Sequence, residues 1–349
     1  MIDLSQSTLS VPQVQTVPTD PGTSWSKEDT VAIDAPPDGE VDPAPEAQWQ
    51  TDARRTGICG AVSPRVVTLP DGLFRMYYTQ ILPRSGFPAG ANDYNNATTR
   101  ILSATSTDSA TWTPEPGVRL LPEEGGAGGL RVVSSDVVPC AEGGLRMYFE
   151  SCSEPQRETS PIRSAVSDDG LVWTVEPGER LGGRGRGYSS PRVVLLDCGW
   201  CRLYCGERGR GIVSAVSEDG GTEFREEPGV RVTPGGTWDA MTAFAPEIMH
   251  LDGGGYLMYY AGYSASNRAN ILRALSDDGL TWRKEAEAEP VLAPDGSRWD
   301  AAKCSEMCIF RLPQQEARAP RYGMVYEGCD GTAADERGVW RVARATSAE

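Results

Sequence analysis

The stretch Ser167-Asp168-Asp169-Gly170-Leu171-Val172-Trp173 decides the fold, because the chain repeats it. A second copy runs from Ser276 to Trp282, a looser one from Ser106 to Trp112, and a copy one residue longer from Ser217 to Phe224. Each copy follows a short apolar stretch. Asp-Gly between two such stretches is typical of a hairpin turn, because glycine adopts the positive φ that the turn requires. The motif therefore predicts a series of strand–turn–strand elements.

A second repeated motif predicts two more strands ahead of each turn. In its first copy, Ser63-Pro64-Arg65-Val66-Val67 leads through Pro70-Asp71-Gly72 to Arg75-Met76-Tyr77-Tyr78. Further copies begin at Ser135, Ser190, Ala245 and Ser305. A third strand and the strand after the turn complete each unit. Each unit is then a four-stranded antiparallel meander, and the units repeat at spacings of roughly 50 to 90 residues. We therefore predict an all-β fold, a five-bladed β-propeller forming one domain over residues 1–349, with a β-sandwich as the alternative.

The two ends of the chain predict how the ring of blades closes. The fifth unit ends after its third strand, Val339–Ala343, and lacks a turn motif and a fourth strand. At the other end, Thr19–Trp25 matches the turn motif in spacing, and Ser26–Ala32 can form a strand. The N-terminal segment, residues 19–34, would complete the last blade and leave no unpaired edge.

The composition excludes several classes of partner. There are 33 lysines and arginines against 49 aspartates and glutamates, a net charge of -16. Such a surface repels phosphate backbones and anionic lipids, so we expect no nucleic-acid or membrane partner. No apolar run approaches the roughly 20 residues that span a bilayer. The N-terminus has no basic start or apolar stretch typical of a secretion signal, which favours a cytoplasmic protein, and the preference for arginine over lysine indicates a bacterial genome.

The cysteines and the single histidine favour a site without metal or cofactor. Nine cysteines are an odd number, and in a cytoplasmic protein we expect reduced thiols. Cys198, Cys201 and Cys205 have a spacing that resembles a metal site, but no fourth ligand lies nearby in sequence, so small core residues are the favoured interpretation. His250 alone excludes a histidine-rich metal cluster. The oligomeric state cannot be inferred from the sequence.

Charged residues at one position of the repeat predict an axial site. Ring closure places the first strand of every blade around the central axis, with the residue after Ser-Pro, or its equivalent, facing one mouth. This position is charged in all five units, as Arg65, Asp136, Arg192, Glu247 and Glu306. The second strands bring further polar residues to the same mouth, namely Gln80, Glu150, Glu207 with Arg208, and Glu327. Two loops carry Trp238-Asp239 and Trp299-Asp300 at matched offsets.

These residue types together predict a sugar site. A sugar ring stacks on an indole face while its hydroxyls bond to carboxylates, so Trp238, Asp239, Trp299 and Asp300 become candidate binding residues, with Glu150, Glu207 and Glu327. Glycoside hydrolysis needs one protonated and one ionised carboxyl group, and Asp136, Glu247 and Glu306 are the catalytic candidates. Glu306 lies in the less polar surroundings, so we predict it to be the proton donor, with Glu247 or Asp136 as its ionised partner. Arg65 and Arg192 hold a substrate carboxylate or simply balance the acids.

The repeats resemble the five-bladed propeller glycosidases, the group that contains arabinanases, β-xylosidases, invertases and levansucrases. Ala245–Ile248 with Tyr256–Tyr260 is similar to the arabinanase segment whose acidic residue tunes the general acid, and the resemblance then implies Glu306 as general acid. The group also has a catalytic aspartate one blade earlier, where this chain has Arg192; aligned from the first blade instead, Arg65 takes the place of the base. The resemblance implies a sugar-active enzyme of the glycoside hydrolase type. A non-hydrolytic cyclase or lyase and a carbohydrate-binding propeller without catalysis remain alternatives.

Overall fold

The computed structural model describes residues 20–37, 39–50, 52–55, 59–84, 97–126, 129–153, 160–183, 185–285, 289–296, 298–313, 322–331 and 338–347. In this part of the chain the fold is all-β, with twenty strands and one four-residue 3₁₀ helix, η2 (Pro122–Gly125). No helix among these residues is long and apolar enough to cross a membrane.

Antiparallel pairing groups the strands into consecutive units. Unit 1 comprises β2 (Gly60–Thr68), β3 (Phe74–Pro83), β4 (Ala97–Ser106) and β5 (Thr113–Pro114). Unit 2 comprises β6 (Arg131–Pro139), β7 (Leu145–Cys152), β8 (Ile162–Ser167) and β9 (Thr174–Val175). Unit 3 comprises β10 (Tyr188–Leu195), β11 (Cys201–Glu207), β12 (Gly211–Ser217) and β13 (Arg225–Glu226). Unit 4 comprises β14 (Thr242–His250), β15 (Tyr256–Ala265), β16 (Arg268–Ser276) and β17 (Arg283–Lys284). Unit 5 comprises β18 (Lys303–Arg311), β19 (Tyr322–Cys329), β20 (Trp340–Ser347) and the N-terminal β1 (Trp25–Ile33).

The number of sheets differs from the number of separate blades that the repeats predict. Units 2 and 3 are separate four-stranded sheets, whereas units 4, 5 and 1 are joined in one twelve-stranded sheet. Each junction is a single parallel residue pair, Ala269 with Lys303 and Gly60 with Trp340. Neighbouring units therefore approach closely enough at these two places for one backbone pairing, and this merges their sheets.

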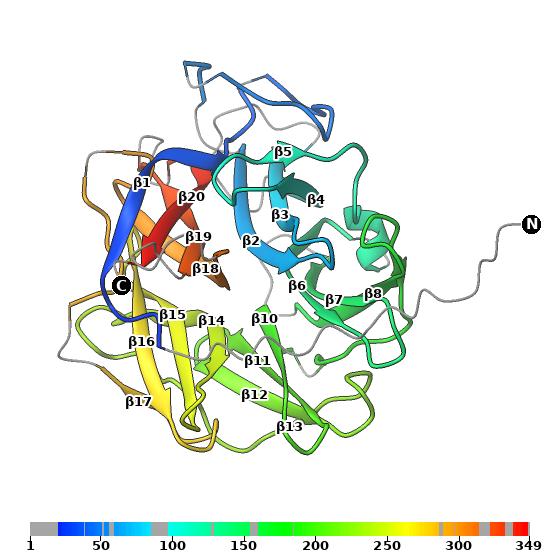
Figure 1. Cartoon of the computed structure of the whole chain (residues 1–349), viewed down its shortest axis with the longest axis vertical. Coiled ribbons are helices and arrows are strands. Elements are labelled where there is room, and N and C mark those ends of the chain that lie inside the picture. Colours follow the sequence, from blue (N-terminus) through cyan, green and yellow to red (C-terminus); the bar gives the residue numbers. More distant parts are fainter. Residues whose placement is uncertain are drawn as a thin grey trace, which may run out of the picture.

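The units are arranged around a common centre (Figure 1). The first strands β2, β6, β10, β14 and β18 are innermost, and each contacts the first strand of the next unit, with β18 contacting β2. Buried hydrophobic clusters fill the spaces between neighbouring units. One of them joins Tyr77 and Ile101 of unit 1 to Met147 and Phe149 of unit 2, and others lie between the remaining pairs of neighbours. The core is therefore distributed between units, and the axis is left to polar residues.

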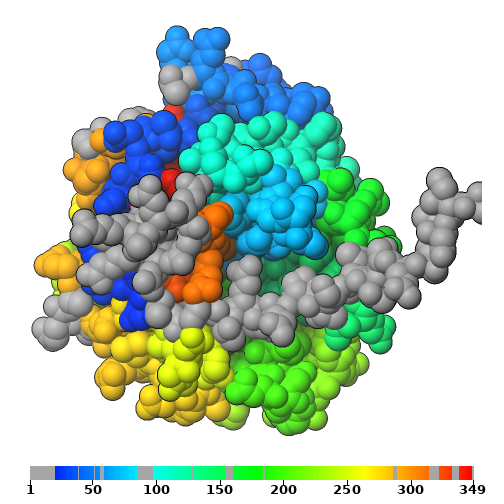
Figure 2. Space-filling model, viewed as in Figure 1, coloured from blue at the N-terminus to red at the C-terminus, as the bar shows by residue number. Residues whose placement is uncertain are grey.

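The predicted pairing of the N-terminal segment with unit 5 is present. Strand β1 pairs antiparallel with β20, Trp25 lying opposite Ser347. The Tyr259 hydroxyl donates to the carbonyl of Gly22 at 2.6 Å, and its ring meets Trp25 edge-on at 6.3 Å. In the space-filling view the blue N-terminal residues lie beside the orange and red C-terminal ones (Figure 2). The first strand of the chain thus supplies the outer strand of the last unit.

The ends of the units opposite the mouth are built from repeated contacts. In the turn motifs, Asp108, Asp169 and Asp278 each accept two backbone N–H groups from residues two and three positions later. In units 2, 3 and 4 a tyrosine of the preceding unit donates to a carbonyl of the turn, as Tyr204 does to Gly279 at 2.8 Å. The same contact occurs between Tyr77 and Gly170 and between Tyr148 and Gly221. We call this end of the molecule the turn end, and the opposite end, where the first strands begin, the mouth end.

Candidate active site at the axis

A β-bulge in the first strand of units 1 to 4 sets the direction of the axial side chains. Each of these strands carries one extra residue relative to its partner, and the residue at the bulge has positive φ. The angles are 53° at Ser63, 55° at Ser134, 51° at Ser190 and 50° at Ala245. Two residues later, the pairing resumes with Arg65, Asp136, Arg192 and Glu247, each opposite a tyrosine of the second strand. Bulges of this kind re-aim side chains and are frequent beside active sites.

In unit 5 the register shows that Glu306 is not equivalent to these four residues. Tyr260 and Tyr326 both donate to the aspartate of a Trp-Asp pair, so Tyr326 corresponds to Tyr260. Glu247 lies opposite Tyr259, and the matching residue, opposite Val325, is Cys308.

Backbone contacts between neighbouring units confirm this alignment. The N–H of Val193 donates to Asp136, that of Ile309 to Glu247, and that of Val66 to the Cys308 sulfur. The fifth axial position is therefore a thiol, and burial raises its pKa to about 11, so it stays neutral. Glu306 lies two residues nearer the mouth, in the layer of Ser63, Ser134, Ser190 and Ala245.

The four charged axial residues form one buried ionic network. Arg65 binds Asp136 through Nε at 2.8 Å and Glu247 through Nη1 at 3.0 Å. Arg192 binds the same oxygen of Glu247 through Nε at 2.9 Å. Two positive charges therefore meet two negative charges. These contacts favour the alternative in which the arginines balance the acids over the one in which they hold a substrate carboxylate.

Glu306 and Glu327 form an acid pair in the layer above this network. Glu306 Oε2 accepts from the Ser63 and Ser134 hydroxyls at 3.0 and 3.1 Å. Glu327 Oε1 lies 2.9 Å from the Ser63 backbone N and 3.3 Å from its Oγ, and Glu327 Oε2 accepts from Ser305 at 2.7 Å. Because a hydroxyl has one proton to donate, Ser63 cannot donate to both carboxylates at once. A proton on one member of the acid pair would complete the network.

Burial is the main reason why this layer retains protons. It raises the pKa of Glu327 to about 8, and the negative charge of Glu306 adds to the effect. The pKa of Glu306 is raised by burial as well, although Arg192, whose Nη2 lies 3.8 Å from Glu306 Oε1, offsets part of it. Burial also raises the pKa of Glu150, which corresponds to Glu327 in unit 2 and accepts from the Cys152 thiol at 3.3 Å. The layer therefore holds at least one protonated carboxyl group at neutral pH.

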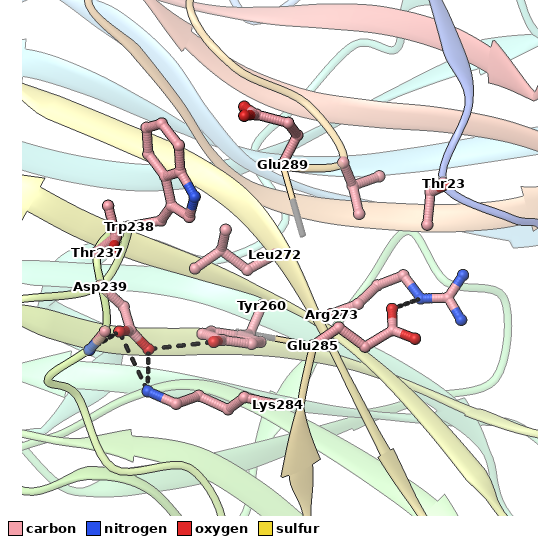
Figure 3. Close-up of a pocket in the computed structure, with 12 residues that line it drawn as sticks. Thr23, Thr237, Trp238, Asp239, Tyr260, Leu272, Arg273, Lys284, Glu285 and Glu289 are labelled. Carbon is pink, nitrogen blue, oxygen red and sulfur yellow. Dashed lines mark hydrogen bonds and ion pairs between the residues drawn. The ribbon is translucent and has the colours of Figure 1, made fainter. Parts of the chain in front are cut away.

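The predicted Trp-Asp pairs bind within their own units. Asp239 forms an ion pair with Lys284 at 2.9 Å and accepts from Tyr260 at 3.1 Å, beside Trp238 in a small side pocket of unit 4 (Figure 3). Asp300 does the same in unit 5, with Lys27 at 2.5 Å and Tyr326 at 2.8 Å. The side chains of Trp238 and Trp299 pack against hydrophobic clusters. These contacts tie the two aspartates to the outer strands of their units, and the substrate-binding role of the four residues stays a prediction.

The other predicted mouth residues differ in their contacts. Glu207 pairs with Arg210 at 2.5 Å and with Arg186 at 3.5 Å. Gln80 accepts from Arg100 at 2.8 Å. Glu150 and Glu327 occupy matching positions in the second strands, opposite Val133 and Ser305, whereas Gln80 and Glu207 match each other one residue further along their strands. Of the carboxylates predicted to bind substrate, Glu327 is thus the one that shares a hydrogen-bond donor, Ser63, with Glu306.

Three features of the site were not predicted from the sequence. Ser63 and Ser134, each two residues before an axial residue, were not recognised as hydrogen-bond donors to Glu306. Cys308 was hidden because the bulge in unit 5 lies one residue away from its place in the other units. Tyr263, discussed below, belongs to no repeated motif.

The described residues contain no group of three or more histidine, cysteine, aspartate or glutamate side chains able to hold a metal ion. All nine cysteines are described, and each is a free thiol.

Comparison with known proteins shows a shared fold. No family model matches the sequence, and no curated protein matches it. Among solved structures, the chain is similar to a putative glycosidase from Bacteroides thetaiotaomicron (TM-score 0.67, 16% identity, 93% of this chain and 97% of that chain). It is also similar to a glycosyl hydrolase from Bacteroides ovatus (TM-score 0.67, 16% identity, 92% and 93%) and to an α-L-arabinofuranosidase from Podospora anserina (TM-score 0.61, 14% identity, 93% and 97%). The predicted resemblance to propeller-type glycoside hydrolases is confirmed as a resemblance of fold.

Proposed function

We propose that the protein is a glycoside-acting enzyme that uses carboxyl general acid–base chemistry at the mouth of a five-bladed propeller. Each antiparallel unit is then one four-stranded blade, and the two parallel pairs merely connect neighbouring blade edges. One observation carries the proposal: two buried carboxyl groups, Glu306 and Glu327, meet at the axis through one serine hydroxyl. The known structures of this fold that resemble the chain include glycoside hydrolases, which supports the choice of a glycosidic bond as the target.

The acid pair supplies the two protonation states that glycoside cleavage needs. At neutral pH the pair holds a shared proton, and Glu306, as the predicted donor, passes it to the departing glycosidic oxygen. The other carboxylate then accepts a proton from the attacking water. Glu247 and Asp136, which form ion pairs with Arg65 and Arg192, place carboxylates beneath a transition state with positive character.

A second candidate function follows from the same ionic network. Both deep carboxylates are bound to arginine, which leaves neither of them as a strong nucleophile. An enzyme that only moves protons, such as a cyclase or lyase, needs no such nucleophile and could use the acid pair alone.

A screen of aryl glycosides tests the proposal. We expect turnover of at least one glycoside, and Glu306→Gln should lower kcat by roughly 10²- to 10⁴-fold while the thermal unfolding stays close to that of the wild type. Glu218→Gln is the matched control, because Glu218 is an exposed glutamate at the turn end.

We expect the activity to fall as pH rises through about 8, the pKa to which Glu327 is raised, because the acid pair then loses its proton. Full activity in Glu306→Gln would remove Glu306 from the mechanism. Elimination or ring closure without hydrolysis would establish the second candidate.

A further inference from the structure

Four side chains form a continuous arc along the mouth of units 4 and 5. The rings of Phe244 and Tyr263 are 5.6 Å apart. The ammonium of Lys303 lies 5.8 Å from the centre of the Tyr263 ring and 5.1 Å from that of Trp340. We call these four residues the mouth arc. Its three aromatic members are partly exposed, in contrast to the tyrosines of the turn end.

The register places the mouth arc at the acid pair. Phe244 and Ser305 occupy the same position in units 4 and 5, immediately before the bulge residue, and Ser305 is a ligand of Glu327. Lys303 lies opposite Cys329. Cys329 is two residues from Glu327, so the side chains of Cys329 and Glu327 lie on the same side of β19. Burial, and then the negative charges of Glu327 and Glu306, raise the pKa of the Tyr263 phenol. The phenol therefore lies within electrostatic reach of both carboxyl groups.

The Tyr263 hydroxyl is available to a ligand. In the described part of the chain it has no hydrogen-bond partner, although hydroxyls of buried tyrosines nearby are bound, as Tyr260 is to Asp239. Aromatic rings with a polar edge suit a ligand that has one apolar face and many hydroxyl groups. Such a ligand is a saccharide, and this step rests on the proposed function.

We propose that the mouth arc, centred on Tyr263, is the platform on which a neutral saccharide stacks above the acid pair. The faces of Phe244 and Tyr263 carry the apolar face of a sugar ring, and the Tyr263 hydroxyl donates to one of its oxygens. The ionic network beneath is already balanced and the layer above it is acidic, so the site does not attract an anionic sugar. The mouth arc lies apart from Trp238 and Trp299, the platform predicted from the sequence, which stays a prediction.

The test compares two tyrosines on the same strand. Binding of p-nitrophenyl glycosides and neutral oligosaccharides is measured by calorimetry in the Glu306→Gln background, where turnover is slow. We expect Tyr263→Ala to weaken binding about 3- to 10-fold, the range of an aromatic stacking contact, and Tyr263→Phe to keep most of it. The control is Tyr256→Ala. Tyr256 is partly exposed at the other end of β15, where it packs on His250 with ring centres 5.0 Å apart.

The outcomes separate the platform from the catalytic proposal. Unchanged binding in Tyr263→Ala, or equal weakening in Tyr256→Ala, would overturn the platform while leaving the acid pair intact. Binding that depends on Tyr263 in a protein that cleaves no glycoside would support the platform and overturn the catalysis. A wild-type protein that binds no saccharide would overturn both.

Discussion

The turn end and the mouth end of the same strands follow opposite rules. At the turn end, units 1 to 4 repeat one contact, a tyrosine hydroxyl donating to a turn carbonyl of the next unit. The arginine–glutamate pairs Arg75–Glu115, Arg146–Glu176 and Arg202–Glu227 repeat as well, each at 2.9 Å. At the mouth end, the axial residues change from unit to unit in charge and chemistry. Residues repeated in every unit build the ring, and residues that vary around one axis are free to form a single asymmetric site.

The largest expected effect on stability is at the axis. Arg192→Met removes one of the two arginines that bind Glu247 and the arginine that lies 3.8 Å from Glu306, so Arg65 alone must balance the buried acids, and unbalanced buried charge is costly. We expect a loss of about 3 to 5 kcal/mol in the free energy of unfolding, measured in urea. Arg225→Met is the control at the turn end. It breaks an exposed pair with Glu218 at 3.7 Å, and its cost should stay within about 1 kcal/mol. Equal losses in the two variants would contradict the distinction between the ends.

The two ends should respond to pH in opposite directions. The pKa of Glu327 is raised from 4.5 to about 8, so its contribution to stability is complete below pH 4.5 and is lost as pH rises through about 8. Between these values the free energy of unfolding should fall by up to about 1.4 kcal/mol per pH unit for one proton. The pKa values of Asp108 and Asp278 are lowered from 3.8 to about 2 by backbone N–H donors, so the turn end loses stability as pH falls through that range.

Glu327→Gln provides the measurement for the mouth end. The free energy of unfolding in urea is measured between pH 5 and pH 8, roughly the range in which Glu327 binds its proton in the folded state only. It should depend less on pH in this variant than in the wild type. An unchanged slope would show that Glu327 is ionised throughout, and it would weaken the acid pair as a proton donor.

The smallest expected effect is at the turn end. Tyr204→Phe removes the hydroxyl that donates to Gly279, and a buried hydrogen bond of this kind contributes about 1 kcal/mol. Thermal unfolding should therefore occur at a lower temperature, whereas kcat/KM should not change. A drop in kcat/KM would show that the turn end communicates with the axis. Unit 5 has Val325 at the position of Tyr204, so a hydroxyl contact of this kind is absent between units 5 and 1 in the wild type.

The repeated parts of the fold could be predicted from the sequence. The Asp-Gly turns and the paired strand motifs predicted an all-β fold that resembles propeller glycoside hydrolases, and the spacing of Asp20 and Trp25 predicted the partner of β20. Repetition is informative because one geometric requirement is met several times by similar residues. The tyrosine and aspartate contacts of the turn end are of this kind.

The candidate site was harder to predict because it lies where repetition fails. Alignment by the Ser-Pro motif placed Glu306 at the position of Glu247, since a bulge after which pairing resumes one residue earlier in unit 5 cannot be read from residue types. The Trp-Asp pairs had the composition of a sugar site, yet Lys27 and Lys284, distant in sequence, neutralise their carboxylates. Unit 5 has Cys329 at the position of Tyr263, so no repeated residue type marks this position, and only its place beside Lys303 and Phe244 reveals Tyr263.

The pairing of β1 with β20 also determines when this protein can finish folding. During synthesis β20 emerges after all the other described strands, so β1 waits for its partner while units 1 to 4 form. Closing a loop of almost the whole chain is slow relative to forming hairpins. In the meantime, Lys27, Glu28 and Asp29 place charges on a strand that would otherwise be an open template for pairing with another chain. The charges on β1 thus protect the partly folded protein from aggregation until β1 pairs with β20.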